Sequence, residues 1–292
     1  MYISKIISNF IYKLKINNRN MKYNNELSVI DTEEKAYLLG QIYGDGYNNA
    51  YTPYKFLMAS INTDTPLYTR LHNLFPFLKL KTYPSHSNMI YLENYEKALC
   101  KDLASYGMIS NKTKNDADGT FHFPNLREDL LPHFIRGYFD ADGSAWYPER
   151  KRSRNNLHIE FACATKNFLL RIKEILDTNG IYFTYTERKK KAGNGKLYQS
   201  YILFSSNYAI SMQFANFVYK DATIYLDYKH ALCYRPKILR PSVVEQYGNC
   251  PYCNSENIQR KGTRNGKQRL HCLDCDKRFT REMPTQEKTL DE

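Results

Sequence analysis

The pattern of hydrophobic and polar residues divides this chain into two long series. Each series shows helix-like and strand-like periodicity in the same order. A helical pattern over residues 33–46 precedes the strand-like YKFLMASI, and a helical pattern over residues 131–143 precedes the similar LHIEFACA. An amphipathic helix, a pair of strands and a further helix are then expected in each series. Their ranges are 65–75, 78–85 with 88–94 and 95–106 in the first series, and 166–180, 181–189 with 197–206 and 208–219 in the second. The pattern predicts the order α-β-β-α-β-β-α twice, hence an α+β fold, with Gly180 ending one helix.

The two series form a weak internal duplication. Asp45 and Asp142 hold the same place, 97 residues apart, whereas residues 64–71 and 165–172 correspond at an offset of 101. Four extra residues in the second copy therefore fall near the basic stretch 148–156. Two copies favour a pseudo-symmetric pair of halves over a longer array. We expect a first half over residues 27–130 and a second half over 131–234.

The two helices that open the copies carry small residues on one face. Gly40 and Gly44 are four positions apart, and Gly137 and Ala141 hold the equivalent places. Small side chains allow two helix backbones to approach closely. We therefore expect these helices to pack on each other, and Gly46 and Gly143 to end them.

Asp45 and Asp142 lie in the last turns of these helices, where the helix dipole disfavours a carboxylate by about 0.3–1 kcal/mol. If the helices pack together, the two acids also repel each other. A divalent metal ion, with Mg²⁺ as the expected ion, explains this placement, whereas the alternative is that each Asp-Gly is a surface turn. A calcium loop starting at Asp140 is excluded because its sixth and twelfth positions are Ala145 and Lys151.

The composition is that of a globular protein with a basic surface. The chain has 292 residues, 42% of them hydrophobic and 25% charged, and 42 Lys and Arg face 30 Asp and Glu, for a net charge of +12 and a pI near 9.2. This surplus favours a polyanionic partner such as nucleic acid, although a solvated basic surface is the alternative. We expect no membrane partner, because no apolar run approaches the ~18 residues of a membrane span.

Four of the seven cysteines form two Cys-x-x-Cys pairs near the C-terminus. Cys250, Cys253, Cys272 and Cys275 have the spacing of a structural zinc site. A redox or disulfide role is the alternative, but an odd cysteine count and the absence of a secretory signal favour an intracellular, reducing compartment. We expect a linker over 235–247, a zinc ribbon over 248–281 and a tail over 282–292.

The expected ribbon is rich in basic residues, with eight basic and three acidic residues between Cys250 and Arg281. The residues that we expect to contact DNA phosphates there are Arg260, Lys261, Arg264, Lys267 and Arg269. A purely structural or protein-binding ribbon is the alternative. Residues 1–26 form a basic N-terminal extension, which could be an organellar presequence, a basic arm for DNA, or a stretch ahead of a start at Met21.

The two motifs, LLGQIYGDG (38–46) and IRGYFDADG (135–143), resemble those of the LAGLIDADG homing endonucleases in their double-motif, single-chain form. The first motif departs from the family pattern at Tyr43, where an acid is frequent. The resemblance implies two αββαββα halves whose motif helices pack at a pseudo-dyad, so that the protein acts as a monomer. It also implies that each half presents a curved antiparallel sheet to the DNA major groove.

The resemblance further implies a sequence-specific, Mg²⁺-dependent endonuclease that cuts both strands of duplex DNA at a long asymmetric site. Asp45 and Asp142 would hold the metal, and the staggered ends would carry 5′ phosphate and 3′ hydroxyl groups. Lys112 and Lys229 match the basic residues that the family places beside its active site, although both could simply be solvent-exposed lysines. Such enzymes belong to introns or free-standing mobile elements.

Two basic runs lie between predicted strands of the second half, where they could contact DNA or remain solvated. They are Arg150, Lys151, Arg152 and Arg154, and then Arg188, Lys189, Lys190, Lys191 and Lys196. A non-cleaving RNA maturase or DNA-binding regulator on the same scaffold is the main alternative, but a pure binder has no reason to keep both Asp45 and Asp142. A transposase is disfavoured because no third catalytic acid is evident.

Overall fold

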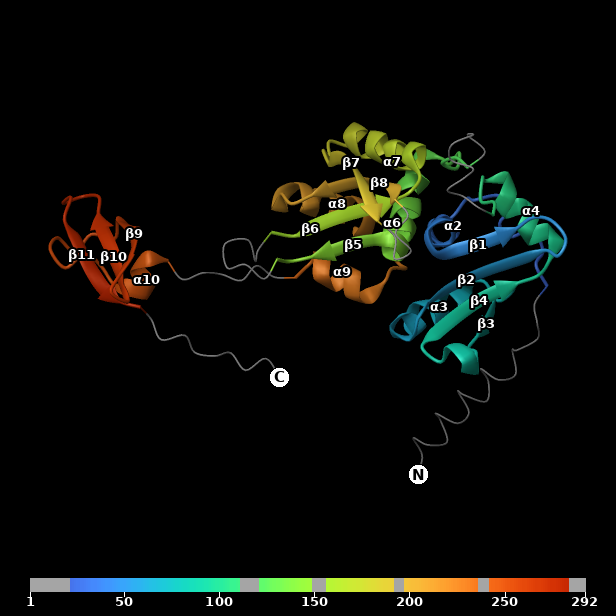
Figure 1. Ribbon diagram of the computed structural model, residues 1–292, viewed down its shortest axis with the longest axis horizontal. Coiled ribbons are helices and arrows are strands. Elements are labelled where there is room, and N and C mark those ends of the chain that lie inside the picture. Colours follow the sequence, from blue (N-terminus) through green and yellow to red (C-terminus); the bar gives the residue numbers. More distant parts are fainter. Residues whose placement is uncertain (1–21, 111–120, 149–155, 192–196, 236–241, 284–292) are drawn as a thin grey trace, which may run out of the picture. The chain divides into compact units, whose positions relative to one another are not determined.

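The structure, a computed structural model, divides into two compact units, Met1–Pro236 and Lys237–Glu292, which are considered separately (Figure 1). It describes residues 22–110, 121–148, 156–191, 197–235 and 242–283. No helix among these residues is both long enough and apolar enough to cross a membrane.

The first half of the large unit is a four-stranded antiparallel sheet with helices on one face, and its strand order is β1-β2-β4-β3. Short 3-10 turns lie at Asn62–Asp64 and Pro84–His86. Its elements are α2 (Glu33–Asp45), β1 (Gly46–Asn49), β2 (Lys55–Ile61), α3 (Thr65–Leu74), β3 (Lys79–Lys81), β4 (Met89–Asn94) and α4 (Lys97–Ser105).

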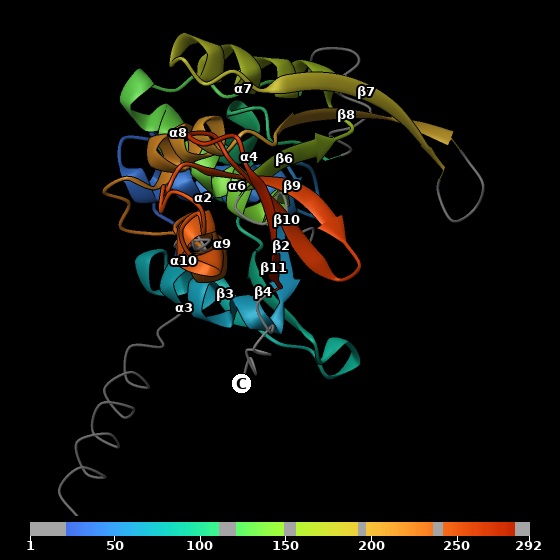
Figure 2. The same cartoon turned by 90° about the vertical axis from the view of Figure 1, so that its left-hand side faces the viewer.

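The second half repeats this arrangement with the strand order β5-β6-β8-β7. Its elements are α6 (Leu131–Asp142), β5 (Gly143–Trp146), β6 (His158–Cys163), α7 (Lys166–Thr178), β7 (Thr184–Lys191), β8 (Leu197–Ser205) and α8 (Tyr208–Tyr219), followed by α9 (Asp227–Cys233). Figure 2 shows β7 and β8 as a long curved hairpin. The prediction of an α+β fold with two αββαββα halves is confirmed.

The local sequence explains where α2 begins and where both motif helices end. The hydroxyl of Thr32 accepts a hydrogen bond from the amide of Lys35 at the start of α2. Gly46 and Gly143 end the helices, but not in the left-handed conformation that such a glycine often adopts, because both are extended and open a strand. Glycine is needed there for space, since a Cβ on Gly46 would lie 2.4 Å from the carbonyl oxygen of Ile42.

Gly180 is the glycine that does end a helix in the left-handed region, with φ = 74°. The amides of Gly180 and Ile181 donate to the carbonyls of Asp177 and Leu176, at 3.0 and 2.9 Å. This is the Schellman arrangement, and it confirms the predicted end of α7.

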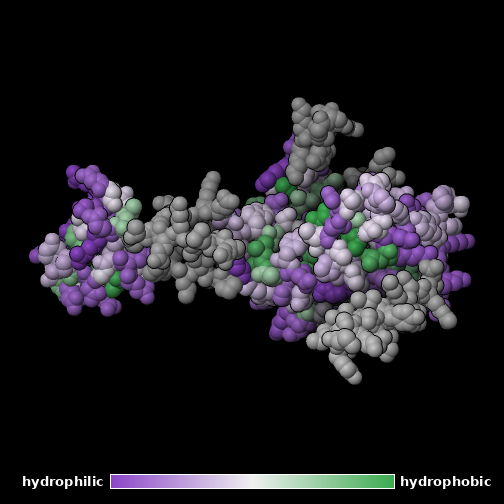
Figure 3. All heavy atoms as spheres, turned by 90° about the horizontal axis from the view of Figure 1, so that it is seen from below, coloured by the Kyte–Doolittle hydropathy of each residue, from purple (hydrophilic) through white to green (hydrophobic). Residues whose placement is uncertain are grey.

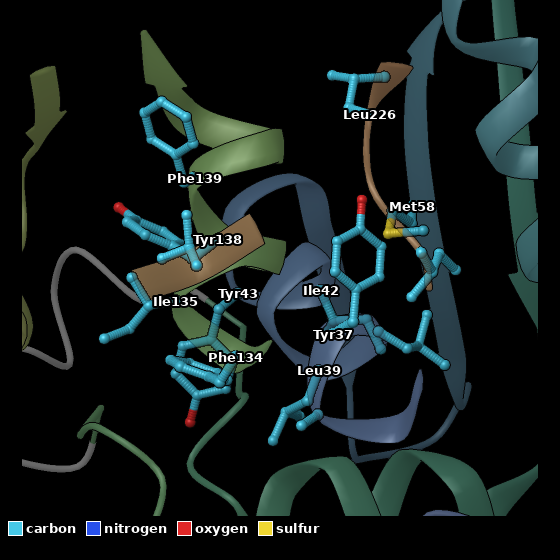
Figure 4. Close-up of a cluster of buried hydrophobic side chains, with 14 of the residues drawn as sticks. Tyr37, Leu39, Ile42, Tyr43, Met58, Phe134, Ile135, Tyr138, Phe139 and Leu226 are labelled. Carbon is cyan, nitrogen blue, oxygen red and sulfur yellow. The ribbon is translucent and has the colours of Figure 1, made fainter. Parts of the chain in front are cut away.

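The core of the large unit lies between the sheets and their helices, and the motif helices run through its middle. Phe56 and Met58 of β2 and Phe161 of β6 are fully buried on the inner faces of the two sheets. Tyr43 and Phe134 pack edge to face between the halves, with ring centroids 5.1 Å apart (Figure 4). Each buried aromatic or aliphatic side chain contributes about 1.5–3 kcal/mol, so this core dominates the stability of the unit.

The small unit is a three-stranded antiparallel sheet in the order β11-β10-β9 with one short helix. The buried hydrophobic side chains in its described part are Cys250, Leu270 and Cys272. Its elements are α10 (Val243–Tyr247), β9 (Ile258–Arg264), β10 (Lys267–Cys272) and β11 (Arg278–Glu282). Domains with so small a core generally depend on a crosslink such as a disulfide or a metal ion.

Two segments outside the expected domains belong to folded parts. Within the N-terminal extension, Tyr23 is buried and its hydroxyl donates to Asp102 at 2.5 Å. Within the expected linker, α10 begins with a capping box formed by Ser242 and Glu245.

Candidate functional site

The motif helices α2 and α6 contact each other backbone to backbone. A Cβ atom on Gly40 would lie 2.1 Å from the carbonyl oxygen of Phe134, and a Cβ on Gly137 would lie 2.1 Å from that of Tyr37. Real Cβ atoms do not approach so closely, hence the two glycines set the distance between the helices. This contact holds the halves of the large unit together.

The same contact brings the two motif acids to one end of the helix pair. A Cβ on Gly44 would lie 2.4 Å from the Cβ of Ala141 and 3.5 Å from the carboxyl carbon of Asp142. Asp45 follows Gly44 directly and is half-buried, whereas Asp142 is exposed. The helices therefore bring the two acids to the same end of the pair, where Asp142 is open to solvent.

The carboxylates of Asp45 and Asp142 both shift the pKa of the same two neighbours, Tyr138 and Lys229. Burial raises the pKa of the Tyr138 phenol well above its ordinary value, and the nearby Cys163 and the carboxylates of Asp142 and Asp45 raise it further. Burial lowers the pKa of the Lys229 ammonium, while Asp140, Asp45 and Asp142 oppose that shift. Both acids therefore lie close enough to these side chains to act on them, and two carboxylates at one end of a helix pair suit a cation.

Lys229 lies beside this end, but it is buried, with 4% of its surface exposed. Its ammonium group donates to the carbonyls of Phe139, Asp140 and Gly143, at 2.8, 2.7 and 2.6 Å. Since an ammonium has three hydrogens, these carbonyls use its whole donor capacity. Lys229 therefore caps the C-terminal end of α6 next to Asp142, and the alternative of a simple solvent-exposed lysine is wrong.

Asp140 of the second motif has a structural environment. One carboxylate oxygen accepts from the Tyr219 hydroxyl at 2.5 Å, and the other accepts from the Tyr37 hydroxyl at 2.9 Å and the Leu226 amide at 2.7 Å. Burial raises the pKa of Asp140, although these hydrogen bonds oppose it. At the equivalent place in the first motif, the buried Tyr43 donates its hydroxyl to backbone carbonyls. The two motifs thus differ in their supporting contacts.

The segment 223–227, which leads into α9 and Lys229, is held by side chains from three helices. Arg136 is fully buried and donates to the Ile224 carbonyl at 2.9 Å and to Glu33 at 2.6 Å. Glu33 also accepts from the Thr223 amide at 2.8 Å, and Arg70 donates to the Tyr225 carbonyl at 2.7 Å. Both halves of the large unit therefore fix the position of α9.

Several predicted site residues lie outside the described residues. These are Lys112, Arg150, Lys151, Arg152, Arg154 and Lys196, and the same holds for the side chains of Lys190 and Lys191.

Arg188 and Lys189 are exposed neighbours in β7, so they point to opposite faces of the sheet. Tyr185 pairs with the buried Leu203 on the inner face, which places Thr184, Thr186 and Arg188 on the outer face. Arg188 is therefore the described member of this basic run on the face that could meet DNA.

The outer face of the first sheet carries polar and aromatic residues that the sequence did not single out. They alternate with the buried Phe56 and Met58 of β2 and with Ile90 and Leu92 of β4. They include Tyr47, Lys55, Lys79, Lys81 and Tyr91. The strand alternation of KFLMASI was the available signal for this face.

The four C-terminal cysteines form one cluster, with all four sulfur atoms within 4.8 Å of one another. The sulfur atoms of Cys250 and Cys275 are 3.7 Å apart, and those of Cys253 and Cys272 are 3.6 Å apart. Tetrahedral zinc with Zn–S bonds of about 2.3 Å requires sulfur separations of about 3.8 Å, so the residues fit that ion. Asn254 and Asp276, each directly after the second cysteine of a pair, adopt positive φ and close two matching turns.

The basic residues predicted in the ribbon do not share one face. Arg260 donates to Gln246 of α10 and lies over the Tyr247 ring. The other four, Lys261, Arg264, Lys267 and Arg269, are exposed, as is Arg260 itself.

Comparison with known proteins identifies a domain in the second half of the large unit. Residues 129–211 match the model of the LAGLIDADG-like domain, which confirms the resemblance over that part of the chain. No curated protein matches the sequence.

Solved structures with a similar arrangement include DNA-bound nucleases. The meganuclease I-AabMI bound to uncleaved DNA is 15% identical with a TM-score of 0.44, over 67% of this chain and 86% of that one. The homing endonuclease I-WcaI on its recognition sequence is 15% identical with a TM-score of 0.44, over 69% and 87%. The N-terminal LAGLIDADG domain of DUF199/WhiA is 17% identical with a TM-score of 0.39, over 66% and 88%.

Proposed function

We propose that the large unit is a sequence-specific, divalent-metal-dependent endonuclease that cuts both strands of duplex DNA. The observation that carries the proposal is the place of Asp45 and Asp142. Two packed helices, one from each half, bring these acids together at their negative ends. Folding alone favours a cation at such a position, so the pair points to a function that needs negative charge.

The residues present fit a hard divalent cation such as Mg²⁺, because carboxylate oxygens are its preferred protein ligands. Asp45 and Asp142 would hold the ion between the halves. When bound, it would activate a water molecule and stabilise the leaving oxygen of the phosphodiester. Water and DNA phosphate would complete its coordination.

The remaining residues of the site hold the acids and the DNA. Lys229 binds the carbonyls at the end of α6 and so fixes the chain on both sides of Asp142. On the outer sheet faces, exposed side chains such as Arg188 and Lys81 would contact the duplex. Two unequal sheets predict a long, asymmetric target bound by one chain.

The small unit would add a structural zinc site in this proposal. Four cysteine sulfurs at tetrahedral separations leave no coordination position for substrate, so the ion would stabilise the fold rather than take part in cleavage.

Cleavage of a long randomised duplex library in Mg²⁺ tests the proposal. The control is the Asp45→Asn/Asp142→Asn variant, which keeps the size of both side chains. We expect products enriched for one site of about 15–30 base pairs, with staggered ends, and none from the control. Binding without cleavage by the unaltered protein, in both Mg²⁺ and Mn²⁺, would favour the maturase or regulator instead.

A further inference from the structure

Basic side chains lie together on one face of the three-stranded sheet of the small unit, β11-β10-β9. In β10, Lys267 and Arg269 are exposed, whereas Gln268 and Leu270, which alternate with them, are buried. The strand register pairs Lys267 with Arg264 on one side, and it pairs His271 with Arg278 on the other. Paired residues share a face, so four charged residues of this face lie together: Lys267, Arg269, Arg264 and Arg278. With Lys261, which lines the same hollow as Arg269 and Arg278, they form the basic face.

The opposite face uses its basic residues for internal contacts. Arg260 is paired with the buried Leu270 and is held by Gln246 of α10. Arg281 is paired with the buried Gln268 and lies over the Phe279 ring, 5.6 Å from its centroid. These two arginines already have partners within the unit, unlike most residues of the basic face.

The charge of the basic face is poorly neutralised. Lys267 has an ion pair with Glu282 at 2.5 Å. Among the residues that the structure describes, Lys261, Arg264, Arg269 and Arg278 have no acidic partner within ion-pair distance. Like charges held together on a rigid sheet repel one another, so this face favours a polyanion. The described surface of the small unit is largely hydrophilic in Figure 3.

A bulge gives the basic face its shape. The β9–β10 register shifts between Gln268 and Leu270, and Gly262 opposite adopts φ = 80°. The buried Gln268 amide fixes the bulge by donating to the carbonyls of Gly262 and Arg269, at 2.8 and 3.0 Å. A hollow of about 390 Å³ is lined by Lys261, Arg269 and Arg278, together with Thr280, which pairs with Arg269, and with Leu270 and Phe279. Three cations thus surround one concave surface.

We propose that the basic face binds the sugar–phosphate backbone of duplex DNA without regard to sequence. The proposal extends the proposed function, because this surface would hold DNA outside the site that is cut. It replaces the set expected from the sequence in two respects: Arg278 is included and Arg260 is not. Lysine and arginine side chains on a rigid sheet suit phosphate contacts, and no pattern of base-reading groups is needed for this.

Salt-dependent binding of the full-length, zinc-loaded protein to a random-sequence duplex tests the proposal. The test variant is Lys261→Gln/Arg269→Gln/Arg278→Gln. The control is Arg260→Gln/Lys277→Gln/Arg281→Gln, which removes the same charge from three side chains that each lie over an aromatic ring of the unit. Both must retain zinc and a wild-type melting temperature. Cleavage is not the readout, so failure of this proposal is separable from failure of the nuclease assignment.

We expect the test variant to lose about tenfold or more in affinity and about 2.7 units in the slope of log K against log salt, about 0.9 for each phosphate contact. The control's loss in affinity and its loss in slope should each be less than half of the loss in the test variant. Equal losses in both variants would show that only net charge matters and would overturn the assignment of this face. Unchanged binding of duplex DNA by the test variant would overturn it as well. So would an equal dependence of single-stranded RNA binding on the same three residues.

Discussion

The carboxyl group of Asp142 in one motif helix lies beside Gly44 of the other, where the absence of a side chain leaves space for it. A Cβ on Gly44 would be 3.5 Å from that carboxyl carbon and in conflict with Ala141. Because Asp45 follows Gly44, the close approach of the helices also brings the two acids together. The small residues therefore serve the site as well as the packing.

The contact between the motif helices should tolerate no added methyl group. Gly40→Ala would force a Cβ to within 2.1 Å of a backbone carbonyl, so the helices must separate. We expect a loss of about 3 kcal/mol or more in the free energy of unfolding, measured by urea denaturation. The control is Gly180→Ala, where nothing lies within 4 Å and the positive φ alone should cost about 1 kcal/mol. Equal losses in the two variants would contradict the packing argument.

Lys229 should affect stability as well as activity. Lys229→Met removes a buried cap from α6, and we expect a loss of about 2 kcal/mol together with reduced cleavage. Lys220→Met, at an exposed lysine, is the control and should change neither quantity. Thermal unfolding and cleavage would be measured on the same preparations. Full stability with no cleavage would instead assign Lys229 a direct role in the reaction.

Arg136 should be among the most sensitive charged residues of the large unit. Arg136→Met leaves the carboxylate of Glu33 without its cationic partner and the carbonyl of Ile224 without the Arg136 donor, so a loss of about 3–5 kcal/mol is expected. Arg171, at a similar place on α7, has an exposed ion pair with Glu174. Arg171→Met should cost less than about 0.5 kcal/mol. Denaturant midpoints of the two variants give the difference between these two losses in the free energy of unfolding, and that difference checks the buried network.

Metal removal should unfold the small unit and expose its thiols. Burial raises the pKa of the Cys100 thiol to about 11 and that of Cys233 to about 12, so neither forms much thiolate at pH 8. We expect a chelator to add four thiols that react with a disulfide reagent, while Cys100 and Cys233 stay unreactive until the large unit unfolds. A reactive thiol count that the chelator does not change would argue against a metal at the four cysteines.

The sequence predicted the element order well because its signals were local. The α7 cap at Gly180 and the limits of α8 follow from periodicity and turn chemistry within a few residues. Strands β1 and β5 were not located, since GYNN and GSAW are too short to show a pattern and form only by pairing with β2 and β6. Tyr23 was assigned to the extension because its burial against Phe77 depends on residues far along the chain.

The site was predictable only in part for the same reason. Asp45, Asp142 and the four cysteines stand in motifs with fixed spacing. The roles of Arg70, Arg136 and Glu33 depend on contacts across 88 to 190 positions of sequence, such as that between Glu33 and Thr223, and no local pattern reports them. The face on which Arg260 lies depends on strand register and on α10, within a segment expected to be linker.

The measurement that tests the central claim most directly is cleavage of a plasmid carrying the selected site, by the unaltered protein and by Asp45→Asn/Asp142→Asn, with DNA affinity measured in parallel. The account predicts a linear product in Mg²⁺ from the unaltered protein, no product from the variant, and affinities that agree within about threefold, because the acids serve the reaction rather than recognition. Cleavage by the variant at the unaltered rate would contradict the assignment of these two acids.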